Sequence, residues 1–267
     1  MLEALQMPFF QHALIAGVLI AVAIGLIGPL TMANKMTFMS GGIAHATYGG
    51  VGAALFFGIS ILAGALIAAL LAAAVVSFVA FRYRHRADTA IGIVWAVGMA
   101  IGVILADMTP GYNVDLMSFL FGSILAVSAD DIRLMALFDL AALGIVWYFY
   151  YDFMALSFDP VFAKLQGVKT AFLHLLLLGL VAITVVLAMR LVGLIMLIAL
   201  LTMPSFSAER YVKSLGQMVI FSIILSIIYI VAGLFFAYWY DLSAGPAIVV
   251  VAVFGTISLF SIKIVKG

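Results

Sequence analysis

Residues 60–81, SILAGALIAALLAAAVVSFVAF, decide the fold, because they carry no charged side chain along their whole length. A helix crosses the hydrocarbon core of a bilayer with about 20 apolar residues, so this run predicts a transmembrane helix. It ends in a basic cluster of Arg82, Arg84 and Arg86. Such clusters are typical of the cytoplasmic end of a span.

The composition of the whole chain agrees with this run. Of 267 residues, 67% are hydrophobic and 9% are charged, and the mean hydropathy is +1.35. Soluble domains are about half apolar and about one-quarter charged, so a soluble protein is excluded. We predict an all-α polytopic membrane protein in which residues 1–267 form one transmembrane domain. The net charge of +1 indicates no nucleic-acid partner, and the lack of cysteine excludes thiolate metal sites.

Run length and breaker residues predict about eight to nine spans. Their expected bounds are 9–33, 37–58, 60–81, 89–108, 131–151, 169–189, 192–208, 216–238 and 245–264. With nine spans, every lysine and arginine except Arg133 and Arg190 falls on one side of the membrane. The positive-inside rule makes that side cytoplasmic, so we expect the N-terminus outside and the C-terminus inside.

The predicted outer loops hold acids and one short apolar segment. The acids either attract cations to a pore mouth or are merely tolerated there; they are Glu3, Asp107, Asp115, Asp130, Asp131 and Asp241. Residues 115–128 are too short to span and predict a re-entrant or interfacial piece. This piece is either a gate or docking surface, or a packed structural cap.

The span at 37–58 is unusually polar and rich in glycine. His45 lies inside it, and helical spacing puts Gly41, Tyr48, Gly49 and Gly52 on the same face. An ionisable group at that depth usually faces a polar cavity, and imidazole suits zinc, manganese and iron. Glycines on this face either let a neighbouring backbone approach closely or leave space for a solute. In the second case the face lines a translocation path, with His45 as a metal ligand. The alternative is a histidine hydrogen-bonded between packed helices.

Two more residues within spans are candidates. Asp139 is an acid well inside its span, where it either faces a pore and contacts metal or pairs with another helix. Pro204, followed by Ser205 and Ser207, predicts a kink that frees backbone carbonyls. That kink either belongs to a moving gate on the translocation path or is static.

The inner loop near 158–168 predicts a short amphipathic helix. Asp159 is placed to cap a helix that begins at Pro160 and ends at Gly167. A short helix in a cytoplasmic loop either lies on lipid or docks into a partner. Its brevity and few basic residues disfavour lipid.

Six segments together resemble the permease subunit of ATP-binding-cassette importers for zinc, manganese and iron. They are MSGGIAHA (39–46), DTAIGI (88–93), LMSFLFGSIL (116–125), FDPVFAKLQGV (158–168), VGLIMLIALLTMP (192–204) and GPAIV (245–249). Each segment alone is a weak sign of the family, but all six occur in the family's order. The resemblance extends over nearly the whole chain.

The resemblance implies a type II ABC-importer-like permease in the cytoplasmic membrane of a prokaryote. It implies a homodimer, cytoplasmic ATP-binding-cassette ATPase subunits and an extracytoplasmic metal-binding protein. The chain itself would be no enzyme and hold no permanent cofactor; its cargo would be a divalent zinc, manganese or iron ion. His45 matches the family's metal-contacting histidine. The segment that matches the ATPase coupling helix contains Asp159, Pro160, Ala163, Lys164, Leu165, Gln166 and Gly167.

One position departs from the family's pattern. The family commonly has aspartate four residues before that histidine, and here the residue is Gly41. Either the ion is held more weakly, or another acid such as Asp139 substitutes, or the cargo is a metal chelate or other small solute. An ion-coupled secondary transporter is a further alternative, which the absence of a visible inverted repeat counts against.

Overall fold

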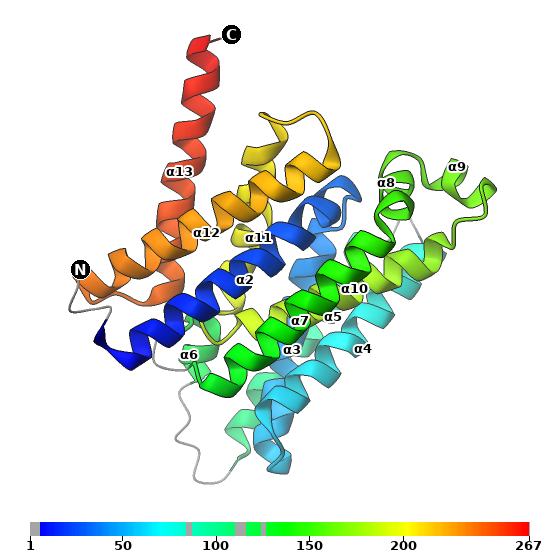
Figure 1. Ribbon diagram of the computed structural model, residues 1–267. Coiled ribbons are helices and arrows are strands. Elements are labelled where there is room, and N and C mark those ends of the chain that lie inside the picture. Colours follow the sequence, from blue (N-terminus) through cyan, green and yellow to red (C-terminus); the bar gives the residue numbers. More distant parts are fainter. Residues whose placement is uncertain (1–5, 84–86, 110–115, 124–126, 267) are drawn as a thin grey trace. The chain divides into compact units, whose positions relative to one another are not determined.

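A computed structural model describes residues 6–83, 87–109, 116–123 and 127–266, and its regular elements there are all α-helices (Figure 1). The prediction of an all-α chain is confirmed. The contacts between residues divide the chain into two compact units. Unit 1 comprises residues 1–33, 117–150 and 187–267, and unit 2 comprises residues 34–116 and 151–186.

Unit 1 is organised around helix α2. Its helices are α2 (Pro8–Ala33), α6 (Leu116–Phe121), α7 (Ala129–Tyr148), α11 (Leu194–Glu209), α12 (Leu215–Tyr240) and α13 (Ala244–Lys266). Helix α2 lies beside α12 and also packs on α7 and α11 (Figure 1). The close approach depends on glycine, because a Cβ at Gly25 would lie 2.4 Å from Ile223 Cα.

Unit 2 is organised around helix α3. Its helices are α3 (Thr37–Phe57), α4 (Ile61–Arg82), α5 (Ala87–Asp107), α8 (Tyr150–Phe158), α9 (Pro160–Leu165) and α10 (Thr170–Ala188). Helix α3 packs against both α4 and α5, and 14 of its 21 residues are buried. It has so many small residues that neighbours approach its backbone on two sides.

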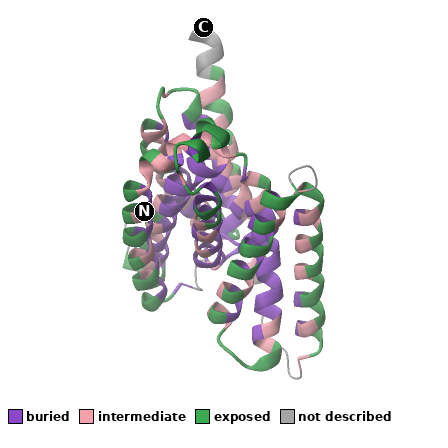
Figure 2. Cartoon of the chain, turned by 90° about the vertical axis from the view of Figure 1, so that its right-hand side faces the viewer, coloured by how far each residue is buried: buried purple, intermediate pink, exposed green. Residues whose placement is uncertain are grey.

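Apolar side chains also cover the exposed faces of the helices. Figure 2 shows exposed positions along the outward faces, and on α5 these include Ile93, Val97, Ile101 and Ile104. A monomeric soluble protein rarely exposes contiguous apolar surface on this scale. Because helices satisfy their own backbone hydrogen bonds, such faces suit lipid.

The span count is slightly below the expected eight to nine. Among the described residues, α2, α4, α5, α10, α12 and α13 are long and apolar enough to cross a membrane, and α7 with α8 would make a seventh. The difference arises at α3 and α11. Helix α3 has 21 residues, but glycine, histidine and hydroxyl side chains lower its mean hydropathy. Helix α11 has only 16 residues.

The fifth expected span ends differently from its prediction. Helix α7 stops at Tyr148, and after Phe149 the chain bends by 66° into α8. No glycine or proline marks this break, so the sequence contained no signal for it. Helix α9 confirms the predicted short helix and its cap, since the Asp159 carboxylate accepts from the N–H groups of Val161 and Phe162 at 2.9 and 3.0 Å. It ends two residues before Gly167, which has a φ of +87°.

Candidate functional site

His45 is a buried imidazole with an unpaired nitrogen. The side chain is 7% exposed, and within the described part of the chain Nδ1 has no hydrogen-bond partner. Its ring stacks on Trp95 of α5, with centroids 3.9 Å apart and planes 7° from parallel. Leaving such a buried group unpaired costs about 1–3 kcal/mol. His45 therefore has unused capacity to bind a ligand.

His174 of α10 shows what a satisfied histidine looks like in the same unit. It is 9% exposed, but its Nδ1 lies 3.0 Å from Ser77 Oγ on α4, and its ring meets the edge of Phe81. This contact joins two helices and needs no ligand. Of these two buried histidines, only His45 has a fully buried ring nitrogen without a hydrogen-bond partner among the described residues.

The site lies where α3 and α5 touch through small residues. The pairs rise together in sequence number, so the two helices run parallel: Gly42 with Ile91, His45 with Trp95, Gly49 with Gly98, and Gly52 with Gly102. We call these four pairs the α3–α5 seam. A Cβ at Gly49 would lie 2.7 Å from Gly98 O, and one at Gly52 would lie 2.1 Å from Gly102 O. The backbones are therefore in direct contact.

This packing gives two of the glycines on the predicted face of α3 a structural role. Gly41, Tyr48, Gly49 and Gly52 are all buried, but so is every residue from Ser40 to Gly52, so burial does not single out one helix face. The structure shows that Gly49 and Gly52 admit the backbone of α5. Their place on a translocation path stays a prediction, as does that of Gly41 and Tyr48.

Asp139 belongs to α7 in unit 1, whereas His45 belongs to unit 2. Its side chain is 5% exposed, and Oδ2 has no hydrogen-bond partner among the described residues. The same residues contain no group of three or more His, Cys, Asp or Glu side chains arranged to hold a metal ion. Asp139 as a metal contact thus stays a prediction.

Pro204 lies inside α11, which continues to Glu209. The neighbouring Ser205 is fully buried, and its Oγ lies 3.1 Å from Leu201 O and 3.2 Å from Ser222 Oγ of α12. The hydroxyl thus provides local polar contacts near the proline. A gating role for Pro204 stays a prediction.

The α8–α9 segment presents exposed apolar side chains. Phe158 and Leu165 are 84% and 82% exposed, and Val161 and Phe162 also project outward. Ala163 is fully buried, while Lys164, Gln166 and Gly167 are exposed. Ser157 of α8 accepts a hydrogen bond from the Asn34 side chain at 2.8 Å, which anchors the segment within unit 2. Exposed apolar surface marks a protein or membrane interaction site, so docking of this segment into an ATPase stays a prediction.

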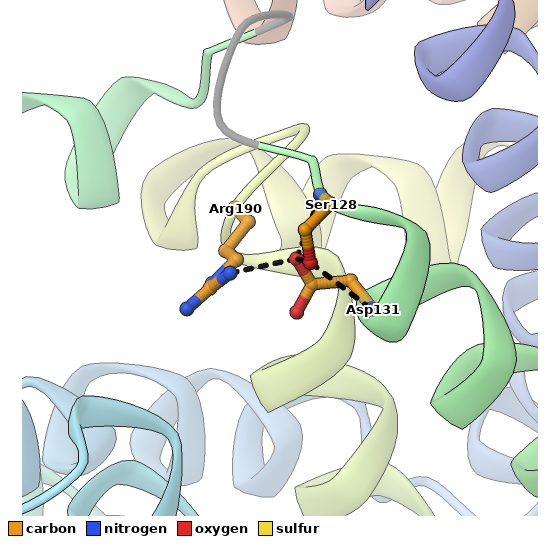
Figure 3. A network of polar contacts seen from close by, with 3 residues as sticks. All are labelled: Ser128, Asp131 and Arg190. Carbon is orange, nitrogen blue, oxygen red and sulfur yellow. Dashed lines mark hydrogen bonds and ion pairs between the residues drawn. The ribbon is translucent and has the colours of Figure 1, made fainter.

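A polar network in unit 1 was not foreseen from the sequence (Figure 3). Oδ2 of Asp131 accepts from the backbone N–H of Ser128 at 2.9 Å, from its hydroxyl at 2.7 Å and from Arg190 at 2.6 Å. Ser128 Oγ in turn accepts from the Asp131 N–H, which completes a capping box at the start of α7. The network ties α7 to the turn before α11.

The same turn takes part in a tight backbone contact, which we call the glycine junction. It joins residues 120–123, residues 190–193 and Gly245. A Cβ at Gly122 would lie 2.2 Å from Leu191 O, one at Gly193 would lie 2.3 Å from Leu120 O, and one at Gly245 would lie 2.1 Å from Val192 O. This packing is compatible with the predicted cap or gate at 115–128, of which residues 115 and 124–126 lie outside the described residues.

Comparison with known proteins decides the family. The ABC 3 transport family matches residues 6–263. The chain belongs to this family. The resemblance to permease subunits of ABC metal importers is thereby confirmed.

Relatives of this ABC 3 protein match it along most of their length. An uncharacterized membrane protein of Synechocystis is 43% identical over 94% of this chain and 90% of its own. The manganese transport system membrane protein MntC of Listeria monocytogenes is 33% identical over 93% and 88%. The solved structure of PsaBC from Streptococcus pneumoniae in complex with Fab is 32% identical, with a TM-score of 0.87 over 97% of this chain and 94% of that chain.

Proposed function

We propose that this ABC 3 protein is the membrane-spanning permease of an ATP-driven importer for a divalent transition metal. His45 carries the proposal, because a buried imidazole with an unpaired nitrogen is a ready metal ligand. Family membership supports transport, and the apolar helices support a place in the membrane.

The proposed complex assigns a partner to each side of the membrane. The exposed tip of α8–α9 docks into a cytoplasmic ATPase, which hydrolyses ATP and switches a homodimer of permeases between outward-open and inward-open states. Delivery by an extracytoplasmic metal-binding protein comes from the opposite side. The N-terminus lies outside and the C-terminus inside, as the positive-inside rule predicts.

Manganese is the first cargo to test, since the Listeria relative is named for manganese transport. Zinc and iron complete the set. Gly41 supplies no carboxylate beside His45, which favours weak transient contact with the ion. It equally motivates a metal chelate as the second candidate cargo, because a chelator brings its own ligands.

The decisive experiment is uptake by the reconstituted complex. The permease, its cognate ATPase and its binding protein are placed in liposomes, and ATP-dependent accumulation of Mn²⁺, Zn²⁺ and Fe²⁺ is measured. We expect one metal to accumulate, and His45→Ala to abolish uptake while the ATPase still assembles. His12→Ala is the matched control, because it makes the same change on α2, which is not part of the α3–α5 seam.

Other results would redirect the proposal. Accumulation of chelated metal but not of free ions makes the chelate the cargo. Uptake without the ATPase, collapsed by an ionophore at constant ATP, indicates an ion-coupled secondary transporter. Full uptake by His45→Ala would contradict the metal contact while leaving the permease function intact.

A further inference from the structure

The α3–α5 seam holds a flat pair of stacked rings at its middle. On one side of His45, Gly42 meets Ile91, and on the other, Gly49 meets Gly98. A Cβ at Gly98 would lie 2.5 Å from Ala46 Cα, immediately beside His45. Because these contacts hold the backbones together, the rings of His45 and Trp95 overlap face to face.

Trp95 is itself held in place. Its indole is partly buried, and the ring of Phe38 on α3 lies near it, with centroids 6.4 Å apart and planes tilted by 43°. The tryptophan thus contacts two side chains of α3 that are seven positions apart, His45 and Phe38. Rotation of the imidazole about its Cβ–Cγ bond would break the ring overlap with Trp95. The stack therefore restrains the plane of the imidazole, and with it the plane in which a ring nitrogen can meet a metal.

The stacking contact does for His45 what a hydrogen bond does for most metal-binding histidines: it orients the ring. A metal-binding histidine is normally oriented by a hydrogen bond from its second ring nitrogen to a carboxylate, carbonyl or water. Among the described residues no hydrogen bond to His45 is found that would orient the ring in this way. The parallel indole at 3.9 Å is the contact that orients this ring.

We propose that Trp95 is a positioning residue for His45, which fixes the imidazole by stacking and thereby sets the affinity of the seam for the transported metal. The inference rests on the proposed metal contact of His45. It concerns a residue that the sequence did not single out.

Transport kinetics test the positioning role. In the reconstituted complex with Mn²⁺ as the probe, Trp95→Leu keeps an apolar side chain but removes the aromatic face. Loss of an orienting partner typically weakens metal affinity by about 10- to 100-fold, so we expect KM to rise about tenfold with the maximal rate little changed. Trp95→Phe should restore most of the affinity. Trp147→Leu makes the same change at an 83% exposed tryptophan and should leave KM unchanged.

A spectroscopic signature separates positioning from mere packing. Histidine-labelled full-length protein in nanodiscs has four histidines, and the His45 ring protons should be shifted upfield by the indole ring current. Trp95→Leu should remove that shift and weaken Zn²⁺ binding read from the same signal. Absence of the shift in wild type, no response of the His45 signal to Zn²⁺, or unchanged Zn²⁺ affinity in Trp95→Leu would overturn the proposal.

The two proposals fail in different ways. If the wild-type complex transports no metal, the proposed function fails. The Zn²⁺ titration then still decides whether Trp95 positions His45. If wild type transports metal and Trp95→Leu transports it with the same KM, the positioning role fails alone.

Discussion

The glycine junction of unit 1 and the α3–α5 seam of unit 2 both rely on glycines that touch backbone, yet they treat polar groups in opposite ways. Beside the junction, the Asp131 carboxylate accepts three hydrogen bonds, one of them from Arg190. Within the seam, Nδ1 of His45 has no partner in the described residues. Buried polar groups are normally satisfied. The satisfied network beside the junction therefore fits a structural joint, whereas the unpaired nitrogen in the seam is the observation on which the proposed metal contact rests.

The largest expected effect is a break of the junction by Gly193→Ala. Gly193 has a φ of +84°, and a Cβ there would lie 2.3 Å from Leu120 O. A left-handed backbone costs a non-glycine residue about 1–2 kcal/mol, and overpacking adds about 1–3 kcal/mol. We expect a loss of about 2–5 kcal/mol, measured by thermal unfolding in nanodiscs.

Gly167→Ala is the matched control for that change. Its φ is +87°, but a Cβ there would meet nothing within 4 Å. This variant should lose only the stability that a left-handed backbone costs a non-glycine residue, about 1–2 kcal/mol. Equal losses in the two variants would show that the junction is not tightly packed.

A smaller effect is expected when the seam is opened by Gly98→Ala. The new Cβ would lie 2.5 Å from Ala46 Cα, so α3 and α5 must move apart at a cost of about 1–3 kcal/mol. Uptake should fall as well, because the His45–Trp95 stack loosens.

Gly92→Ala makes the same substitution in the same helix but meets nothing within 4 Å. Since alanine favours helix over glycine by up to about 1 kcal/mol, this control should be neutral or stabilising and transport normally. Uptake at wild-type level in Gly98→Ala would show that transport does not depend on close packing of the α3–α5 seam.

The smallest effect concerns the carboxylate beside the junction. Asp131→Asn weakens the charge-assisted contact with Arg190, which is partly exposed, so we expect a loss of about 1–2 kcal/mol. Asp130→Asn removes an ion pair with Arg133 that is open to solvent and should change stability by less than about 0.5 kcal/mol.

Uptake per folded molecule should be unchanged in both aspartate variants. This distinguishes them from His45→Ala, for which we expect loss of uptake. A transport defect in well-folded Asp131→Asn would show that the polar network of unit 1 takes part in transport and is not only structural.

The helices were largely predictable from the sequence. The expected spans at 37–58 and 169–189 correspond to α3 (Thr37–Phe57) and α10 (Thr170–Ala188). The short helix after Asp159 was predicted by its cap. The bend between α7 and α8 was not, because Phe149 is neither glycine nor proline and the break has no local signal.

The site was predictable only in part. His45 was identifiable because a histidine within an apolar span is expensive and therefore conspicuous. Its stacking partner Trp95 was not, because residues 50 positions apart in sequence meet only through the parallel register of α3 and α5. The ion pair of Asp131 with Arg190 was missed because its two residues are 59 positions apart in sequence and meet only in the folded chain.

The sequence by itself determined that the chain is an all-helical membrane protein, because hydrophobic length and charge sidedness are local properties of each segment. It also determined the family, through short segments in a common order. Only the tertiary structure decided what the glycines do: Gly49 and Gly52 receive the backbone of α5, while Gly193 receives that of Leu120. The absence of a side chain is visible in sequence, but what fills the space is set by which helix packs there.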